Sequence, residues 1–210
     1  MMTTPYICTV ASYFVFSLSH STGFTTGHDA TVLFMKKPRI QTELNKMKIL
    51  RHCYRIMATG TWDAISVADL EAGMAKTRGA IFYFNKNKSE LFINMIDELF
   101  LPIFKLNEQN KKCYLDCSST LFFASYKNPF ERVSNDLRIN YNIPNPNRAL
   151  FNIINQAQNQ YPNFNKIIKH EIELEIIFIK NIIGSNETFE LDLEGIYSKS
   201  IGKLFLSAII

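Results

Sequence analysis

The stretch from Ser66 to Phe92 constrains the fold more than any other part of the chain, because three helix starts follow one another closely there. Ser66 is followed three residues later by Asp69, which is the spacing of a capping box: the serine oxygen accepts a backbone N–H and the carboxylate accepts one in return. A helix is therefore predicted to begin at Val67. Gly73 is predicted to end that helix, because glycine adopts the left-handed backbone conformation without a steric cost.

The next two helix starts follow at Thr77 and Asn87. A turn over about residues 73 to 76 leads to Thr77, which is predicted to cap a second helix beginning at Arg78. Asn87 is predicted to cap a third helix beginning at Lys88. Two short helices, a tight turn and a longer third helix form the layout of a helix-turn-helix. Lys76, Thr77 and Arg78 are expected at the exposed leading edge of the second helix, which is the helix expected to touch DNA.

The same stretch, extended back to Ile49, resembles the DNA-binding domain of the tetracycline-repressor (TetR) family of bacterial regulators. The resemblance runs without gaps from about Ile49 to Phe92, and a combination of positions carries it: Ile49, Leu50, Trp62, Ser66, Val67, Leu70, Thr77, Arg78, Gly79, Phe82, Lys88 and Leu91. Three positions depart from the family's pattern. The glycine of the first turn comes one residue early, at Gly60; Ala75 stands where the family usually has its turn glycine; and Asn85 replaces a buried aromatic, whose space Phe84 is expected to fill.

The resemblance implies a ligand-responsive transcriptional repressor that binds a double-stranded DNA operator as a homodimer. It implies an all-α fold, in which a three-helix helix-turn-helix head is followed by a helical-bundle domain for dimerisation and for an unknown small-molecule effector. Arg78 is expected to contact a base or a phosphate, because its planar guanidinium can bond guanine through two N–H groups. Thr77 and Lys88 are expected to hold phosphates. Phe82 or Tyr83 is expected to meet a thymine methyl or the sugar backbone. The full set of residues predicted at the DNA is Ser66, Lys76, Thr77, Arg78, Gly79, Phe82, Tyr83 and Lys88.

A basic amphipathic helix is predicted before this stretch. From about Thr42 to Thr59 the apolar residues recur at intervals of three and four, and Gly60 is expected to close the helix. Between Met35 and Arg55 only Glu43 opposes the basic residues Lys36, Lys37, Arg39, Lys46, Lys48, Arg51 and Arg55. Such a segment suits attraction to phosphates. An ordinary solvated helix face is the alternative interpretation.

Beyond Phe92 the chain shows helical periods and no sustained strand-like alternation, which predicts an all-α protein. A helix from Lys88 is expected to join the head to the body, and Pro102 is expected to kink it or to end it early. Later helices are predicted at 129–141, at about 147–161, at 164–183 and from Leu191 to the end. The Asn-rich tract 140–165 is interpreted as folded, because apolar residues interrupt it with helix-like spacing.

The predicted domains are a non-native or disordered extension at 1–34, a helix-turn-helix domain at 35–88 and an all-helical regulatory and dimerisation domain at 89–210. Residues 6–18 are apolar but too short to span a bilayer, and no Lys or Arg precedes them as in a secretory signal. A degenerate signal or membrane anchor is the alternative. TetR-like proteins pair through their last two long helices. This chain is expected to supply only the first of these, so a C-terminal truncation and a weakened dimer are expected.

The remaining chemistry indicates neither an enzyme nor a bound cofactor. Cys8, Cys53, Cys113 and Cys117 do not form a disulfide framework, which favours a reducing cytoplasm. Cys53 is expected in the core, and Cys113 with Cys117 lacks the further ligands of a closed zinc site. A phosphate-binding glycine loop, an HExxH motif and a nucleophile elbow are all missing from the sequence.

Two other classes of protein remain open. The first is an all-α interaction protein whose helix-turn-helix has lost DNA binding, as the residues Ala75 and Asn85 suggest. The second is a carrier or an enzyme with a pocket among the aromatic residues of the body. The candidate ligand-binding residues, for an effector or for such a substrate, are Phe122, Phe123, Tyr126 and Phe151. Aromatic side chains of this kind belong more often to a core than to a binding site.

Overall fold

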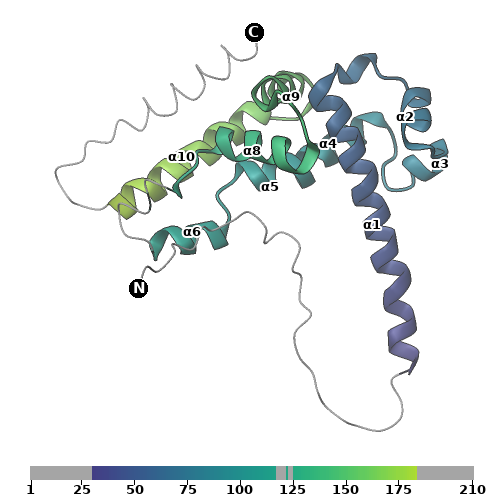
Figure 1. Ribbon diagram of the computed structural model, residues 1–210, viewed down its shortest axis with the longest axis horizontal. Helices are drawn as coiled ribbons and strands as arrows, with labels where there is room; N and C mark the ends of the chain where they lie inside the picture. Colours follow the sequence, from purple (N-terminus) through teal and green to yellow (C-terminus); the bar gives the residue numbers. More distant parts are fainter. Residues whose placement is uncertain (1–29, 117–121, 123–124, 184–210) are drawn as a thin grey trace, which may run out of the picture. The chain divides into compact units, whose positions relative to one another are not determined.

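The computed structural model describes residues 30–116, 122 and 125–183, with side chains from Ile40 onward (Figure 1). Every regular element in these ranges is a helix, and no strand occurs among them, which confirms the all-α prediction. The chain divides into two compact units, Met1–Ile40 and Gln41–Ile210. The helix predicted from Leu191, together with Cys117 and Phe123, lies outside the described residues. None of the helices within them combines the length and the apolar character that crossing a membrane requires.

The first helix, α1, spans Ala30–Thr59, so it ends at Thr59 as predicted but begins well before Thr42. A 3-10 turn, η2, follows at Trp62–Ala64. The next elements are α2 at Val67–Met74, α3 at Arg78–Ile81 and α4 at Lys88–Met95. The starts of α2, α3 and α4 confirm the predictions made from the three capping residues.

The chain from Lys88 to Phe104 is one helical run that changes its hydrogen-bonding pattern midway. After α4 comes a π-helical segment, η3, at Ile96–Phe100, followed by α5 at Leu101–Phe104. The N–H of Leu101 donates to the carbonyl of Ile96, five residues back. Pro102 lacks an N–H, and its ring would clash with a carbonyl four residues back in a regular α-helix. The wider π turn accommodates the proline, which therefore lies within the run and does not end it.

Four further helices follow within the described residues: α6 at Glu108–Leu115, α8 at Pro129–Tyr141, α9 at Pro146–Gln160 and α10 at Phe164–Ile183. The last three confirm the predicted helices to within one residue at each end. They also confirm that the Asn-rich tract is folded. Asparagine has a local role in this tract, because Asn145 caps the start of α9 and Asn142 ends α8 in the left-handed conformation.

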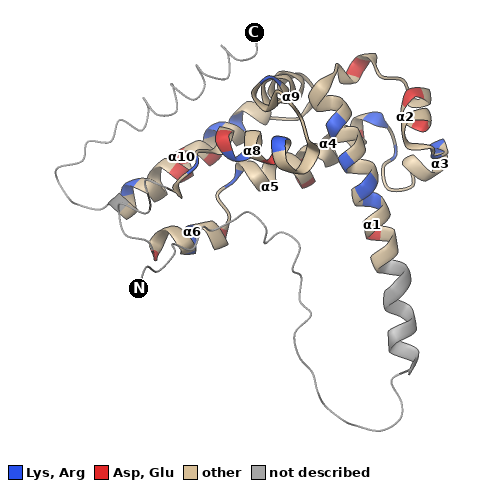
Figure 2. Ribbon diagram, in the orientation of Figure 1, with Lys and Arg blue, Asp and Glu red and all other residues tan. Residues whose placement is uncertain are grey.

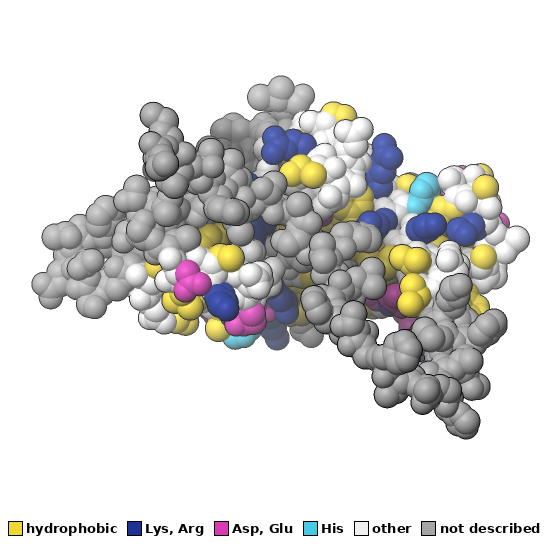
Figure 3. All heavy atoms as spheres, turned by 60° about the horizontal axis from the view of Figure 1, so that its bottom comes forward, with side chains coloured by type: hydrophobic (Ala, Val, Ile, Leu, Met, Phe, Trp, Pro, Cys, Tyr) yellow, Lys and Arg dark blue, Asp and Glu magenta, His cyan; other side chains and the backbone are white. Residues whose placement is uncertain are grey.

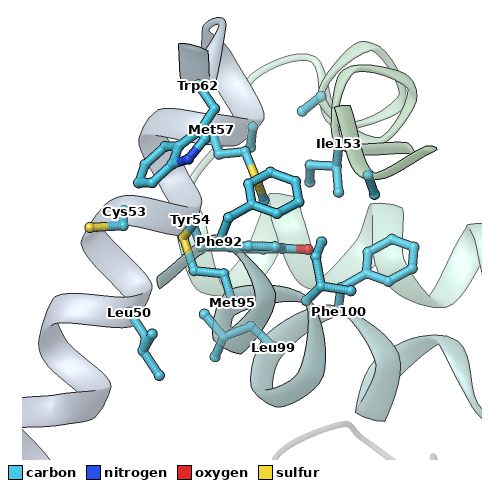
Figure 4. Packing of buried hydrophobic residues seen from close by; sticks show 14 of the residues in the cluster. Leu50, Cys53, Tyr54, Met57, Trp62, Phe92, Met95, Leu99, Phe100 and Ile153 are labelled. Atoms are coloured by element: carbon cyan, nitrogen blue, oxygen red, sulfur yellow. The ribbon is translucent and has the colours of Figure 1, made fainter. Parts of the chain in front are cut away.

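The main hydrophobic core joins the end of α1 to the run from α4 to α5 and to α9. Figure 4 shows Tyr54 and Met57 of α1 projecting toward Phe92 and Met95, and all four side chains are fully buried. Cys53 is also fully buried, as predicted, and burial raises the pKa of its thiol to about 12. A thiol held in this way is neutral at physiological pH and packs as a small apolar side chain.

A buried ion pair fixes the end of this run against α8 and α10. The guanidinium of Arg132 donates to both carboxylate oxygens of Glu175, at 2.8 and 2.6 Å, and to the carbonyls of Ile103 and Phe104. The hydroxyl of Tyr126 donates to Glu175 Oε1 at 2.7 Å. Both charges are thus paired and hydrogen-bonded, as buried charges must be to persist. The pair anchors the carbonyl end of α5, which would otherwise need donors from solvent.

Candidate nucleic-acid interface and adjoining cleft

The start of α2 is held by the predicted capping box. Ser66 Oγ accepts the N–H of Asp69 at 3.1 Å, and Asp69 Oδ2 accepts the N–H of Ser66 at 2.8 Å. Hydrogen bonds from the Ser66 side chain and backbone hold the pKa of Asp69 below its ordinary value. Ser66 is exposed, but its hydroxyl is already part of the cap. Its main role in the folded chain is therefore to fix where α2 begins.

The turn between α2 and α3 differs from the prediction. The left-handed residue is Ala75, with φ 49° and ψ 43°, whereas Gly73 lies inside α2. Gly73 is small for another reason, because a Cβ at this position would lie 3.1 Å from Nε2 of His52 on α1. The prediction that Gly73 ends the helix was wrong, because the left-handed turn lies at Ala75 and Gly73 is a helical residue that faces His52 of α1 at close range.

The start of α3 is an exposed, cationic edge. Thr77 Oγ1 accepts the N–H of Ala80 at 3.4 Å and caps the helix as predicted. Thr77, Arg78 and Gly79 are all exposed, whereas Ile81 is fully buried and anchors the short helix to the core. Within the described part of the chain Arg78 forms no ion pair. Lys76, in the turn just before, is half-buried.

The aromatic residues after α3 point in different directions. Phe82 is half-buried and packs against the main core, whereas the side chain of Tyr83 is 75% exposed. The ring of Phe84 lies edge-on to Tyr83 at 4.8 Å and also packs partly against the core. Asn85 is buried, and its Oδ1 accepts a hydrogen bond from Nδ2 of Asn94 at 2.6 Å. Of the two aromatic residues predicted at the DNA, Tyr83 is thus the accessible one.

Lys88 is engaged within the protein. Its Nζ donates to the carbonyl of Trp62 at 2.5 Å and lies 5.1 Å from the centre of the Trp62 ring. Asn87 caps α4 as predicted, with its Oδ1 accepting the N–H of Glu90 at 2.8 Å. The ammonium therefore holds the 3-10 turn after α1 against the start of α4, through a hydrogen bond and a cation–π contact.

The basic residues of α1 divide between two environments. Nζ of Lys46 lies 2.5 Å from Oε1 of Glu98. The charge of Arg51 acts on Asp136, but the pKa of Asp136 is raised because burial outweighs that attraction. Lys48 and Arg55 are exposed. Figure 2 shows Lys and Arg along α1 and on α3, with Asp and Glu on α2. In the space-filling view of Figure 3, Lys and Arg side chains gather beside a histidine on the right, where α1 to α3 lie.

A cleft with a volume of about 670 Å³ lies among the helices that follow α4. It is lined by residues of η3, α5, α8, α9 and α10, and Phe151 of α9 is one of them. Phe122 and Tyr126 instead stack on each other at 5.3 Å and belong to a second apolar cluster with Ile179 of α10. The aromatic residues predicted to form one pocket are therefore divided between a small core and the cleft.

A set of polar contacts between α9 and the end of α1 was not predicted. Nδ2 of Asn152 donates to the carbonyl of Gly60 at 2.7 Å and to that of Met57 at 3.1 Å. Nε2 of Gln156 donates to the same two carbonyls, at 3.2 and 3.0 Å, and its Oε1 accepts the N–H of Trp62 at 2.6 Å. We call these two side chains the amide clamp. Their spacing of four residues, which places them on one helix face, was the available sequence signal.

Comparison of the chain with protein-family models, with curated proteins and with solved structures gives no match in any of the three. Among the described residues, no group of three or more His, Cys, Asp and Glu side chains is arranged to hold a metal ion. The local geometry of α1 to α4 and of the cleft is therefore the basis on which function is inferred.

Proposed function

We propose that this protein is a DNA-binding transcriptional regulator of the TetR type, in which α2 and α3 form a helix-turn-helix and α3 enters the major groove. The observation that carries the proposal is the edge formed by Thr77, Arg78 and Gly79, which combines a free guanidinium with exposed backbone at a helix start. Arg is the side chain that most often reads guanine, and backbone N–H groups at helix starts contact phosphates. Lys48 and Arg55 add positive charge on the neighbouring helix.

Gly79 supports the proposal because folding gives no reason for a glycine there. A Cβ built at this position meets no atom within 4 Å, and no left-handed backbone angle requires glycine. In the middle of a helix glycine costs roughly 0.5–1 kcal/mol relative to alanine, which is an upper value for Gly79 near the start of the four-residue α3. A glycine that lowers stability, and that neither packing nor the backbone conformation requires, suits a surface that another molecule approaches closely. On DNA, a phosphate beside Gly79 would be that molecule.

The test is to measure folding stability and DNA affinity for Gly79→Ala. Stability in urea should rise by up to about 1 kcal/mol, whereas affinity for a duplex selected by the wild-type chain should fall. Arg138→Ala serves as a control, because Arg138 is an exposed arginine on α8, away from the proposed interface. Unchanged affinity in Gly79→Ala, or an equal loss in Arg138→Ala, would argue against α3 as the DNA-reading element.

We also propose that the helices after α4 form the regulatory part, that the cleft holds a small-molecule effector and that two copies pair as a homodimer. The volume of about 670 Å³ lies within the range of sites for drug-sized ligands. A dimer places two α3 helices on half-sites about one helical turn of DNA apart. The selected DNA should therefore contain two related half-sites in opposite orientation.

A further inference from the structure

Helix α9 is shared between the cleft and the end of α1. Phe151 and Ile154 line the cleft, whereas Asn152 and Gln156 form the amide clamp on the carbonyls of Met57 and Gly60. Figure 1 shows α9 beside the C-terminal end of α1. The last carbonyls of a helix have no partner within the helix, so donors from another element fix its position. The two faces of α9 thus connect the cleft to the end of α1, from which the chain leads into α2 and α3.

The lining of the cleft indicates which ligands suit it. Five phenylalanines contribute to it, one each from η3, α5, α8, α9 and α10: Phe100, Phe104, Phe130, Phe151 and Phe164. The ring of Phe104 meets Phe100 face to face and Phe130 edge-on, each at 5.5 Å. Phe100, Phe104, Phe130 and Phe164 are buried core residues, whereas Phe151 is half-buried and offers aromatic surface to the cleft. An aromatic wall of this kind favours a flat aromatic guest. The carboxamides of Asn155 and Gln158 supply donors and acceptors for one or two polar groups on that guest.

We propose that the cleft binds a planar, largely apolar aromatic compound and that α9 transmits its binding to Trp62 and the end of α1 through the amide clamp. Asn152 and Gln156 are then positioning residues for the proposed DNA-binding surface. The inference rests on the proposed function only in that the transmitted change is expected to alter DNA affinity.

The hydrogen-bond geometry makes the transmission physically direct. Gln156 is buried, and its side chain joins α9 to Met57, Gly60 and the backbone N–H of Trp62 at 2.6 to 3.2 Å. Close-packed interiors do not deform continuously, so a guest that displaces the cleft face of α9 also displaces its clamp face. Hydrogen bonds of this length weaken steeply when the donor and acceptor separate or lose alignment. The backbone amide of Trp62 therefore reports the position of α9.

The experiment uses the full chain labelled with ¹⁵N-tryptophan. Trp62 is the one tryptophan in the sequence, so the spectrum holds only its backbone amide and its indole N–H. The probe is 2-naphthol, a planar aromatic with one hydroxyl group. The backbone amide should shift progressively during the titration and reach saturation. Phe151→Ala should require more naphthol for the same shift, because it removes one wall of the cleft.

The clamp variants decide the mechanism. In Gln156→Met the naphthol-induced shift of Trp62 should be lost, because the bond to the Trp62 N–H is removed. In Asn152→Ala, which keeps that bond but loses the donor to Met57 and Gly60, the shift should be reduced. In Asn159→Ala the shift should persist, because Asn159 is an exposed amide on the same helix whose one bond among the described residues is to the carbonyl of Asn155. If Gln156→Met does not fold, Asn152→Ala, whose side chain is half-buried, decides alone. A Trp62 amide that stays unmoved up to the solubility limit of naphthol, or that shifts equally in the clamp variants, overturns the inference.

DNA binding is then measured with and without 2-naphthol on the duplex selected by the wild-type chain. The wild-type affinity should change by about five-fold or more, which is the lower end of common allosteric couplings, and Asn152→Ala should reduce that change. A Trp62 shift in a chain that selects no DNA would sink the proposed function and leave the connection through α9 intact. Selective DNA binding with an unresponsive Trp62 would support the proposed function and overturn the connection through α9.

Discussion

Replacing Ala75 by glycine should stabilise the protein, although most substitutions destabilise. Ala75 has φ 49° and ψ 43°. This left-handed conformation raises the conformational energy of an L-residue by roughly 1–2 kcal/mol, but not that of glycine. Glycine loses about 0.5–1 kcal/mol more conformational entropy on folding. Ala75 is exposed, so removing its methyl group sacrifices little packing. The net expectation for Ala75→Gly is a gain of about 0.5–1 kcal/mol in the free energy of unfolding.

Equilibrium unfolding in urea, followed by the fluorescence of Trp62, measures this gain as an increase of about 0.5 M in the midpoint at unchanged slope. Ala72→Gly is the matched control, because Ala72 is also exposed but lies within the regular part of α2. That variant should lose about 1 kcal/mol through helix propensity alone. If Ala75→Gly destabilises the protein as Ala72→Gly does, the left-handed turn between α2 and α3 is not the conformation in solution.

Three further predictions concern polar groups that are buried or half-buried. Tyr54→Phe should leave the free energy of unfolding unchanged or raise it by up to about 1 kcal/mol, because the buried Tyr54 hydroxyl has no partner among the described residues; a loss above that size would reveal a bridging water. Arg132→Met alone should cost about 3–5 kcal/mol by leaving the buried Glu175 carboxylate unpaired, whereas Arg132→Met with Glu175→Leu should cost far less. Equal costs would contradict this. Burial and the charge of Arg55 lower the pKa of His52 below 6.5, so the unfolded chain binds more protons than the folded one just below that pH. The stabilisation is then complete above pH 6.5 and declines as the pH falls, and His52→Gln should flatten this part of a pH series of urea midpoints; an unchanged slope would assign it to another group.

Local capping chemistry was readable from the sequence because each cap depends on residues three positions apart. Ser66, Thr77 and Asn87 each begin a helix where the pattern predicts. The apolar period after Lys88 likewise predicted the helical run that continues from α4, since one face of a helix must be buried as a unit. These elements needed no knowledge of distant partners.

Features that depend on distant parts of the chain were not readable in the same way. Gly73 looked like a helix end, but its small size serves the approach of His52 from α1. Phe122 and Phe151 are similar in type, yet they belong to different clusters, because the path of the chain and not composition decides which aromatics meet. The Asn-rich tract was interpreted only as folded, because nothing local distinguishes Asn152 of the clamp from the other asparagines around α9.

The contact of the half-buried Lys88 with Trp62 was not readable from the sequence for the same reason. Its position at a helix start favoured a phosphate contact, but the carbonyl of Trp62 and the face of its ring lie within reach of the ammonium. A sequence pattern identifies the start of α4 but not what lies in front of it. Of the residues predicted at the DNA, the exposed edge at Thr77, Arg78 and Gly79 therefore carries the most weight.

Selection from a pool of random duplex DNA, performed in parallel with the wild-type chain and with Arg78→Ala, tests the central claim most directly. The wild-type chain should enrich one sequence with two related half-sites. Arg78→Ala should bind that sequence more weakly by about 1–3 kcal/mol and lose its preference at one position of each half-site. Enrichment of no common sequence by the wild-type chain, or an unchanged preference in Arg78→Ala, would contradict the assignment of α3 as the element that reads DNA.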